Sequence, residues 1–324
     1  MKKILFLIMI ATMVIGCNKN EELIQDVENQ STLEERSTLE RKGMLNFRSI
    51  EGLQSFIKER SKPDFDHLKE ARSFSERRVY NPLLLVYNLK EKEMKSLGID
   101  EREVPSVASD DDMFLLLLNQ DGEMGVGDKI VRVDGDFVFT YVDGSAKDID
   151  SFLEKYKSGN IRISRGKTID FSKNLTVYMH NNKTETVESD SRGVTSFRFF
   201  SGDYRMKARQ FDEYWYVYSS IGASTKVQKR SRFLWWTTWG AVYAHNRLEY
   251  NATYRVNFNT QGLPPAIRKA NGFKYPYSLQ ARAVYSWNVG FPASEKYEPM
   301  EGETKHWAHW YTTPVNTVSL TLNY

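Results

Sequence analysis

Residues 278–291 read SLQARAVYSWNVGF, and their apolar side chains fall on every second position. These positions are Leu279, Ala281, Ala283, Tyr285, Trp287 and Val289. A period of two is that of a β-strand, because successive side chains along a strand point to opposite faces of its sheet. The stretch therefore predicts a strand with one face packed against a hydrophobic core.

The rest of the C-terminal part contains segments of the same kind, separated by Gly, Pro and Asn. They read VTSFRFF, YRMKARQF, YWYVYSS, AVYAHNRLEYNATYRVNFNT and TVSLTLNY. A series of short alternating strands with turn residues between them is typical of an antiparallel sandwich or barrel. All seven Trp lie between Trp215 and Trp310, so the composition changes where these strands begin. We therefore expect an all-β, antiparallel, sandwich-like domain at residues 194–324.

Helical patterns are found in the N-terminal half. SIEGLQSFIKER places Leu53 and Ile57 on one face of a helix. Aspartates at 110–112 precede MFLLLL and predict an N-capped helix through Leu118. DIDSFLEKYKSG predicts a further helix that ends at Gly159. The run NPLLLVYNL fits either a strand or a short buried helix.

Strands are predicted between these helices. KIVRV and FVFTYV flank the dipeptide Asp134-Gly135, which is a strong signal for a two-residue hairpin turn. Helices and strands together predict an α+β domain at residues 45–165. Residues 166–193, which end in the polar run NNKTETVESDSRG, are expected to connect this domain to the β domain.

The chain begins with a targeting signal. Lys2 and Lys3 precede a largely apolar run of twelve residues, 4–15. That run is shorter than the roughly 20 residues that a transmembrane helix needs, and it is typical of a secretory signal peptide. Cys17 is the single cysteine of the chain, which excludes an intramolecular disulfide and a Cys-rich zinc site.

The sequence Val14-Ile15-Gly16-Cys17 resembles the lipobox of bacterial lipoproteins. This resemblance implies a signal peptide at residues 1–16 and lipidation of Cys17 with two or three acyl chains. A single acyl chain binds a membrane only marginally, so several chains imply an effectively permanent attachment. Residues 17–44 are polar and charged and are expected to form a flexible tether.

The residues after the lipobox carry a second resemblance. CNKNEE resembles the surface-export signal of Bacteroidota-type lipoproteins, and Asn18 in place of Asp favours the outer membrane. FLLLLNQDGEMGVGDKIVRV is similar to a stretch of exported lipoproteins of that group, which have a β-rich C-terminal domain. The resemblance implies a lipid-anchored protein of the outer membrane, exposed at the cell surface or facing the periplasm. It implies no particular activity.

Signals for catalysis or for a cofactor are sparse. GxSxG and nucleotide-binding glycine motifs are absent, which leaves His180 and His245 as candidates to pair with a serine across the fold. His306 and His309 would share a face on a helix and bind a metal with a nearby glutamate, whereas on a strand they would point to opposite faces. The β-like surroundings favour the strand, so we expect no metal site and no cofactor.

Residues 233–245 read FLWWTTWGAVYAH and place three tryptophans within five residues. The basic side chains just before them are Lys226, Lys229, Arg230 and Arg232. On a regular strand the first and third tryptophans share a face, which suits a sandwich core, and Trp236 points to the other face. We therefore predict Trp236 as an exposed ligand contact, with Lys229 and Arg230 beside it.

These features favour a non-catalytic binding protein with a glycan or an envelope protein as its partner. Indoles stack on sugars and suit interfaces, while a formal net charge of +3 is too small to indicate a nucleic-acid partner. A hydrolase of polysaccharide or peptide and a structural envelope component are the alternatives. Two carboxylates about 5–10 Å apart in a cleft would favour a glycosidase; a flat, aromatic, carboxylate-poor face would favour binding.

Overall fold

A computed structural model describes the chain from residue 43 to 309 and from 317 to 323. The described part excludes residues 63–64, 90, 101–102, 108, 110, 181–193, 202, 234–235 and 260–261, and the side chains of 91–92, 201, 231–233 and 236–238. The predicted signal peptide, Cys17 and nearly all of the predicted tether lie outside it. Met44 is already buried in a hydrophobic cluster, so the packed structure begins just before the predicted start at residue 45.

Every helix in the described residues lies in the N-terminal part of the chain. The helices are α3 (Ile50–Arg60), α4 (His67–Glu76), α5 (Leu83–Val86), α6 (Glu91–Ser96), α7 (Asp112–Leu117) and α8 (Lys147–Lys157). The predicted helices at 49–60, 110–118 and 148–159 are therefore confirmed, and the ambiguous run NPLLLVYNL contains a helix. Asp111 caps α7 through its side chain, as the sequence predicts, and Ser49 caps α3 in the same way.

The N-terminal sheet has the strand order β1-β2-β3-β4-β6-β5. Its strands are β1 (Asn46–Phe47), β2 (Glu123–Val126), β3 (Lys129–Asp134), β4 (Phe137–Val142), β5 (Thr168–Ser172) and β6 (Leu175–Met179). The β3–β4 hairpin turns at Gly135, where φ is +58°, a conformation that glycine adopts readily. The hairpin prediction is confirmed.

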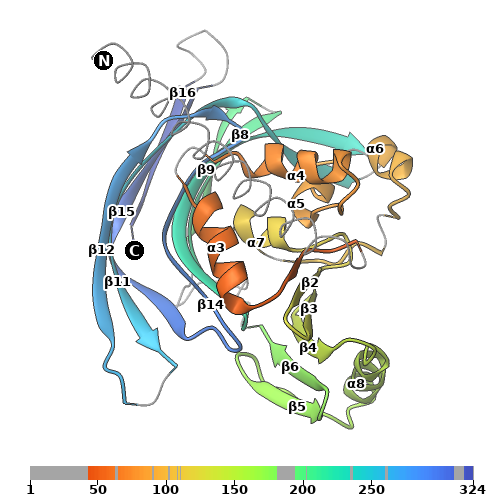
Figure 1. The fold of residues 1–324 in the computed structure, drawn as a ribbon. Helices are drawn as coiled ribbons and strands as arrows, with labels where there is room; N and C mark the ends of the chain where they lie inside the picture. The colour runs from red at the N-terminus through yellow and green to blue at the C-terminus, as the bar shows by residue number, and fades with distance from the viewer. Residues whose placement is uncertain are drawn as a thin grey trace, which may run out of the picture.

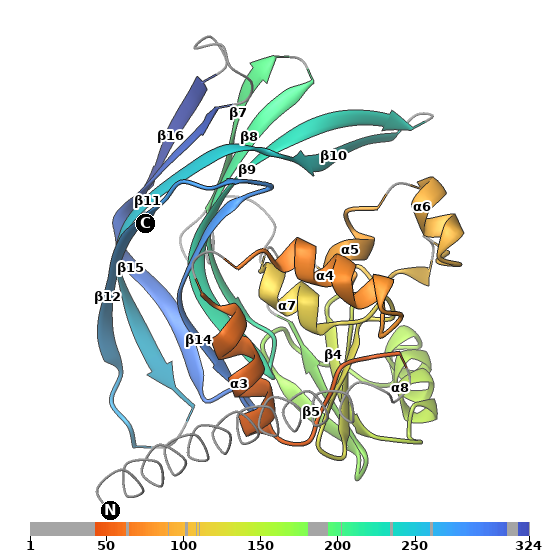
Figure 2. The same cartoon turned by 45° about the horizontal axis from the view of Figure 1, so that its top comes forward.

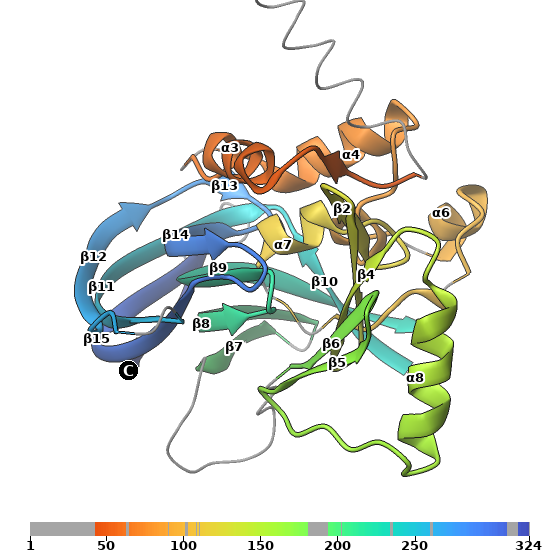
Figure 3. The same ribbon diagram turned by 60° about the horizontal axis from the view of Figure 1, so that its bottom comes forward.

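The predicted connecting segment at 166–193 is wrong in its first half. β5 and β6 pair with each other, and β6 pairs with β4, so both strands belong to the N-terminal sheet. The physical reason is burial: Leu175 and Val177 pack with Phe139 and Phe152 in one hydrophobic cluster. Figure 3 shows α8, which carries Phe152, lying along this sheet.

The C-terminal part forms two antiparallel sheets. The central sheet has the order β10-β9-β8-β7, and β14 also pairs with β9; the outer sheet has the order β12-β11-β15-β16, and β13 also pairs with β11. The strands are β7 (Thr195–Ser201), β8 (Tyr204–Tyr214), β9 (Tyr218–Phe233), β10 (Trp236–Val242), β11 (Ala244–Phe258), β12 (Ala266–Lys274), β13 (Tyr277–Ser278), β14 (Ala281–Val289), β15 (Glu295–His309) and β16 (Thr317–Asn323). The expectation of a β-rich, antiparallel C-terminal region is confirmed.

One predicted strand, YWYVYSS, is wrong because the chain turns within it. β8 ends at Tyr214 and β9 begins at Tyr218. Between them Tyr216 has a φ of +65°, and the Trp215 N–H donates to the Tyr218 carbonyl at 2.7 Å. The run of aromatic residues resembles a strand in the sequence, but two of its members close a tight turn.

The central sheet lies between the outer sheet and helices α3, α4 and α7 (Figures 1 and 2). Toward the outer sheet it contributes small and aliphatic side chains such as Ala223 and Val227, which pack against Leu248 and Ala244 of β11. Two antiparallel sheets with an apolar layer between them form a sandwich-like arrangement. The opposite face of the central sheet is called the helix-side face below.

The two predicted domains share one hydrophobic core. The cluster that contains Leu53 of α3 and Phe114 of α7 also contains Trp215 and Tyr218. The Phe114 ring centroid lies 5.2 Å from both of those aromatic rings. The predicted boundary at residue 194 therefore crosses this shared cluster, whereas other hydrophobic clusters lie wholly on one side of it.

Candidate functional site

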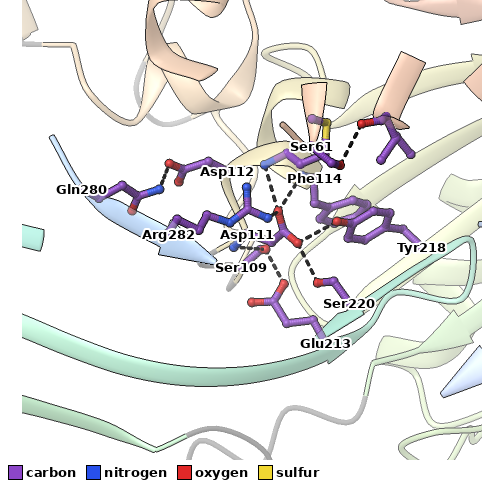
Figure 4. A network of polar contacts seen from close by, with 12 residues as sticks. Ser61, Ser109, Asp111, Asp112, Phe114, Glu213, Tyr218, Ser220, Gln280 and Arg282 are labelled. Atoms are coloured by element: carbon purple, nitrogen blue, oxygen red, sulfur yellow. Dashed lines mark hydrogen bonds and ion pairs between the residues drawn. The ribbon is translucent and has the colours of Figure 1, made fainter. Parts of the chain in front are cut away.

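A buried carboxylate joins α7 to the central sheet (Figure 4). Asp111 is 0% exposed, and its Oδ1 caps α7 by accepting the N–H groups of Met113 at 2.9 Å and Phe114 at 3.3 Å. The Arg282 guanidinium, from β14, forms an ion pair with the same oxygen. One side chain therefore caps the N-terminus of a helix and binds a strand that follows much later in the sequence.

The second oxygen of Asp111 accepts two hydroxyl groups from β9. Tyr218 donates at 2.7 Å and Ser220 at 2.6 Å. Burial by itself raises the pKa of this carboxyl, but Arg282 and the two hydroxyl donors outweigh burial and hold the pKa below its ordinary value. Asp111 is therefore ionised and saturated by protein donors at neutral pH.

Glu213 is a second buried carboxylate of this network. Its Oε2 accepts the Ser109 hydroxyl at 2.5 Å and the Trp215 indole N–H at 3.0 Å, and Arg209 lies 3.8 Å from Oε1. Burial raises the pKa of Glu213. Asp111 and Glu213 both face protein donors and not solvent, so the network joins helices to the sheet rather than presenting an acid and a base to a substrate.

A solvent-facing groove of about 280 Å³ lies on the face of the outer sheet that points away from the central sheet. Its lining residues are His245, Arg247, Tyr275, Trp307, Ala308, His309 and Thr317. Side chains alternate between the two faces of a strand. Ala244 and Leu248 of β11 point into the sandwich, so His245 and Arg247 point outward, into the groove. We call this feature the outer groove.

Arg247 of β11 is one of the residues that line the outer groove. Its guanidinium carbon is 4.4 Å from the ring centroid of Trp307, the residue directly opposite on β15, and 4.9 Å from that of Phe273. Its Nη2 is 2.5 Å from Oε1 of Glu249, so a carboxylate neutralises this cation. Arg247 is therefore stacked against aromatic rings and paired with a carboxylate that is not part of the groove lining.

Histidine and tyrosine side chains form the rim of the outer groove. His245 and His309 are opposite each other on β11 and β15, and their ring centroids are 6.3 Å apart. The Nδ1 of His309 lies 2.8 Å from the Thr317 hydroxyl. Tyr275 and Tyr277 are 55% and 64% exposed and lie 5.7 and 4.9 Å from the His245 ring. These groups can hydrogen-bond to a ligand whose apolar face stacks on the rings.

The outer groove has the composition of a binding surface. None of the described residues that line it carries a carboxylate, so they do not provide the pair of carboxylates that glycoside hydrolysis uses. Likewise, the part of the chain that the structure describes contains no group of three or more His, Cys, Asp or Glu placed to hold a metal ion. The geometry is suited to stacking and hydrogen bonding.

The histidines singled out by the sequence have separate environments. His306 and His309 lie on strand β15 and point to opposite faces, as the strand interpretation predicts. His306 is buried between the hydroxyls of Thr225 and Thr304, each 2.7 Å from a ring nitrogen. His180 stacks on Trp215 with ring centroids 3.8 Å apart.

The three predicted contact residues do not share one face. Lys229 and Arg230 are consecutive in β9, so they point to opposite sides of the central sheet. Trp236 pairs with Phe233 across the β9–β10 hairpin, so the tryptophan run is not one continuous strand; its side chain and Trp235 lie outside the described residues. The prediction of an exposed Trp236 remains a prediction.

The sequence did not indicate the outer groove as a site. Its lining comes from β11, β15, β16 and the segment before β13, and only the strand register places His245 beside His309. The available signal was the alternation in AHNR and HWAH, which puts polar and aromatic residues on one face. Sequence spacing does not show which strands are neighbours.

Comparisons with other proteins give no further assignment. No protein-family model, no curated protein and no solved structure matches the chain. No helix of the described residues has the length and apolar character needed to cross a membrane.

Proposed function

We propose that this protein is a membrane-anchored surface lipoprotein that binds a glycan without catalysis, through the outer groove. The anchor rests on the resemblance of residues 14–17 to a lipobox, with Cys17 as the lipidated residue. The observation that carries the binding role is the aromatic groove on the outer sheet, whose described lining contains no carboxylate.

The groove offers the two kinds of contact that a sugar requires. The C–H face of a pyranose packs on an aromatic ring, for which Trp307 and Tyr275 are available, and its hydroxyls need donors and acceptors, for which His245, His309 and Thr317 are available. Exposed amides continue the same face farther along the strands. These amides are Asn251, Asn271 and Asn323.

A hydrolase is less well supported by this geometry. The buried carboxylates Asp111 and Glu213 are occupied by protein donors, and Asp111 has no exposed surface. An acid and a nucleophile or base for glycoside hydrolysis must reach the scissile bond. The structural envelope role predicts no specific ligand, so a binding measurement separates it from the proposed function.

The test is affinity electrophoresis of the full chain through gels that contain a panel of neutral and acidic polysaccharides. We expect at least one polysaccharide to retard the wild type, and Tyr275→Ala and Trp307→Ala to reduce the retardation at least about tenfold, which is about 1.4 kcal/mol. Ile267→Ala is the matched control, because Ile267 is 62% exposed on the same sheet away from the groove.

Two results would overturn the proposal. The first is a wild type that none of the polysaccharides retards. The second is retardation that Tyr275→Ala and Trp307→Ala both leave unchanged. Release of new reducing ends from a retarding polysaccharide would show a hydrolase instead.

A further inference from the structure

A second aromatic site lies on the helix-side face of the central sheet, around Arg205 of β8. The Arg205 guanidinium carbon is 4.0 Å from the ring centroid of Phe197 and 4.0 Å from that of Trp239. Its Nε donates to the Gln228 side-chain oxygen at 2.9 Å. Two rings and one hydrogen bond therefore hold the guanidinium in place, and the two terminal nitrogens remain as donors.

Strand register explains why these side chains meet. Phe199 is directly opposite Arg205 on β7, Gln228 is opposite it on β9, and Trp239 is opposite Arg230 on the β9–β10 ladder. Phe199 also contacts Trp239, with ring centroids 5.8 Å apart, and is 57% exposed. The site therefore opens to solvent at Phe199.

The charge at this site is different from that of the outer groove. Within the part of the chain that the structure describes, no carboxylate forms an ion pair with Arg205, whereas the outer-groove cation Arg247 pairs with Glu249. Lys207 points to the same face as Arg205 and lies directly opposite Lys226. Like charges on opposed positions repel each other, and Asp112 and Glu213 offset part of that repulsion.

The surroundings of Lys207 lower its pKa. Burial is the main cause, and together with the charges of Lys226 and Arg205 it lowers the pKa of Lys207 to about 7. Asp112 and Glu213 lie on this side of the sheet and attract both lysines, which opposes the lowering. Arg205, which forms no ion pair among the described residues, is therefore the cation on which the site depends.

We propose that the Arg205 site binds the oxyanion of an acidic saccharide. The two terminal nitrogens of an arginine form a planar fork that matches a carboxylate, sulfate or phosphate, and an arginine already held by stacking loses less freedom on binding. The exposed ring of Phe199 offers a face on which the sugar ring packs. This proposal is independent of the outer groove, which is on the other sheet.

The test is isothermal titration of the full chain with three acidic saccharides: a glucuronate disaccharide, a sulfated disaccharide and N-acetylglucosamine 6-phosphate. The neutral disaccharide and free N-acetylglucosamine are the ligand controls, and the three arms distinguish carboxylate, sulfate and phosphate. We expect at least one acidic saccharide to bind at least about tenfold more tightly than its uncharged counterpart.

Substitutions at the site distinguish the contribution of the planar guanidinium group from that of a positive charge alone. Arg205→Lys keeps the charge and loses the fork, and it is expected to weaken binding at least tenfold, as is Arg205→Gln. Phe199→Ala is a second variant with little effect on folding, because its ring is largely exposed, and it is expected to weaken saccharide binding severalfold. Arg255→Gln and Ile267→Ala, both on the outer sheet and outside the outer groove, are the matched controls and should bind as the wild type does.

Three outcomes would overturn the proposal. One is that no acidic saccharide binds more tightly than its uncharged counterpart. Another is that Arg205→Lys binds as tightly as the wild type. The last is that inorganic sulfate or phosphate binds as tightly as the saccharides and Phe199→Ala has no effect, which would show an anion site without a sugar contact. None of these outcomes decides whether the outer groove binds a glycan.

Discussion

Replacing Asp111 with Ala is expected to destabilise the protein by at least about 4 kcal/mol. The substitution removes the cap of α7, which contributes about 1 kcal/mol. It also leaves the buried Arg282 charge without its carboxylate, and breaking a buried ion pair by removing one partner costs about 3–5 kcal/mol. The hydroxyls of Tyr218 and Ser220 lose an acceptor as well. Domains are stable by only about 5–15 kcal/mol, so this loss is large.

The measurement is urea unfolding of the full chain, followed by tryptophan fluorescence. Asp111→Asn keeps an oxygen for the cap and loses the charge, so we expect a smaller loss than for Asp111→Ala. The double variant Asp111→Leu/Arg282→Met removes both charges, and we expect it to be more stable than Asp111→Ala, because no unpaired charge stays buried. A loss below about 1 kcal/mol for Asp111→Ala, or a double variant less stable than it, would refute the reasoning.

The pH dependence of the same carboxylate has a definite sign. The pKa of Asp111 in the folded protein is below its ordinary value, so the unfolded chain takes up the proton first as the pH falls. The stabilisation is therefore fully present above about pH 4, the ordinary aspartate range, and is lost as the pH falls through the folded pKa. Asp111→Asn should lack this part of the acid dependence.

Three further predictions concern other residues. Cys17→Ala should release the protein from the membrane fraction or leave it unprocessed, and unchanged attachment on fractionation would contradict the lipid anchor. Burial lowers the pKa of His306 to about 3, so the unfolded chain binds a proton that the folded one does not between about pH 6.5 and 3. Stability should fall with decreasing pH by up to about 1.4 kcal/mol per unit, and urea midpoints at several pH values should show a smaller slope for His306→Gln. Gly222→Ala should be strongly destabilising, since its Cβ would lie 2.2 Å from the Ala283 carbonyl oxygen, whereas Gly240→Ala, with nothing within 4 Å, should melt close to the wild type.

Local features of the fold were predictable from the sequence because they depend on neighbouring residues. The capping aspartate of α7, the spacing of Leu53 and Ile57 in α3, and the glycine of the β3–β4 turn are all encoded within a few positions. The alternation at 278–291 corresponds to strand β14, with Ala281 and Ala283 buried in the sandwich. The prediction of a single core-facing side is wrong beyond Val284, because a bulge there turns Trp287 and Val289 to the helix-side face. These signals need no knowledge of the partner strand.

Features that depend on strand partners were not predictable. β5 and β6 belong to the N-terminal sheet only because β6 pairs with β4, and the polar sequence around them suggested a linker. The outer groove and the Arg205 site are assembled by register across several strands. In the sequence, the tryptophan run resembles part of one strand. Phe233 and Trp236 instead pair across the β9–β10 hairpin, so the alternation of faces along a single strand does not apply to this run.

The order in which the chain is made has a consequence for how the shared core can form. The groups that Tyr218, Ser220 and Arg282 supply to Asp111 follow it by 107, 109 and 171 residues. A chain that emerges from its N-terminus therefore presents α7, with the apolar Phe114, long before β9 and β14 arrive to cover it. Contacts between residues so distant in sequence slow folding and prolong the exposure of apolar surface. We therefore expect the nascent chain to depend on a holding chaperone until β14 is available, and a chain truncated before β14 to aggregate.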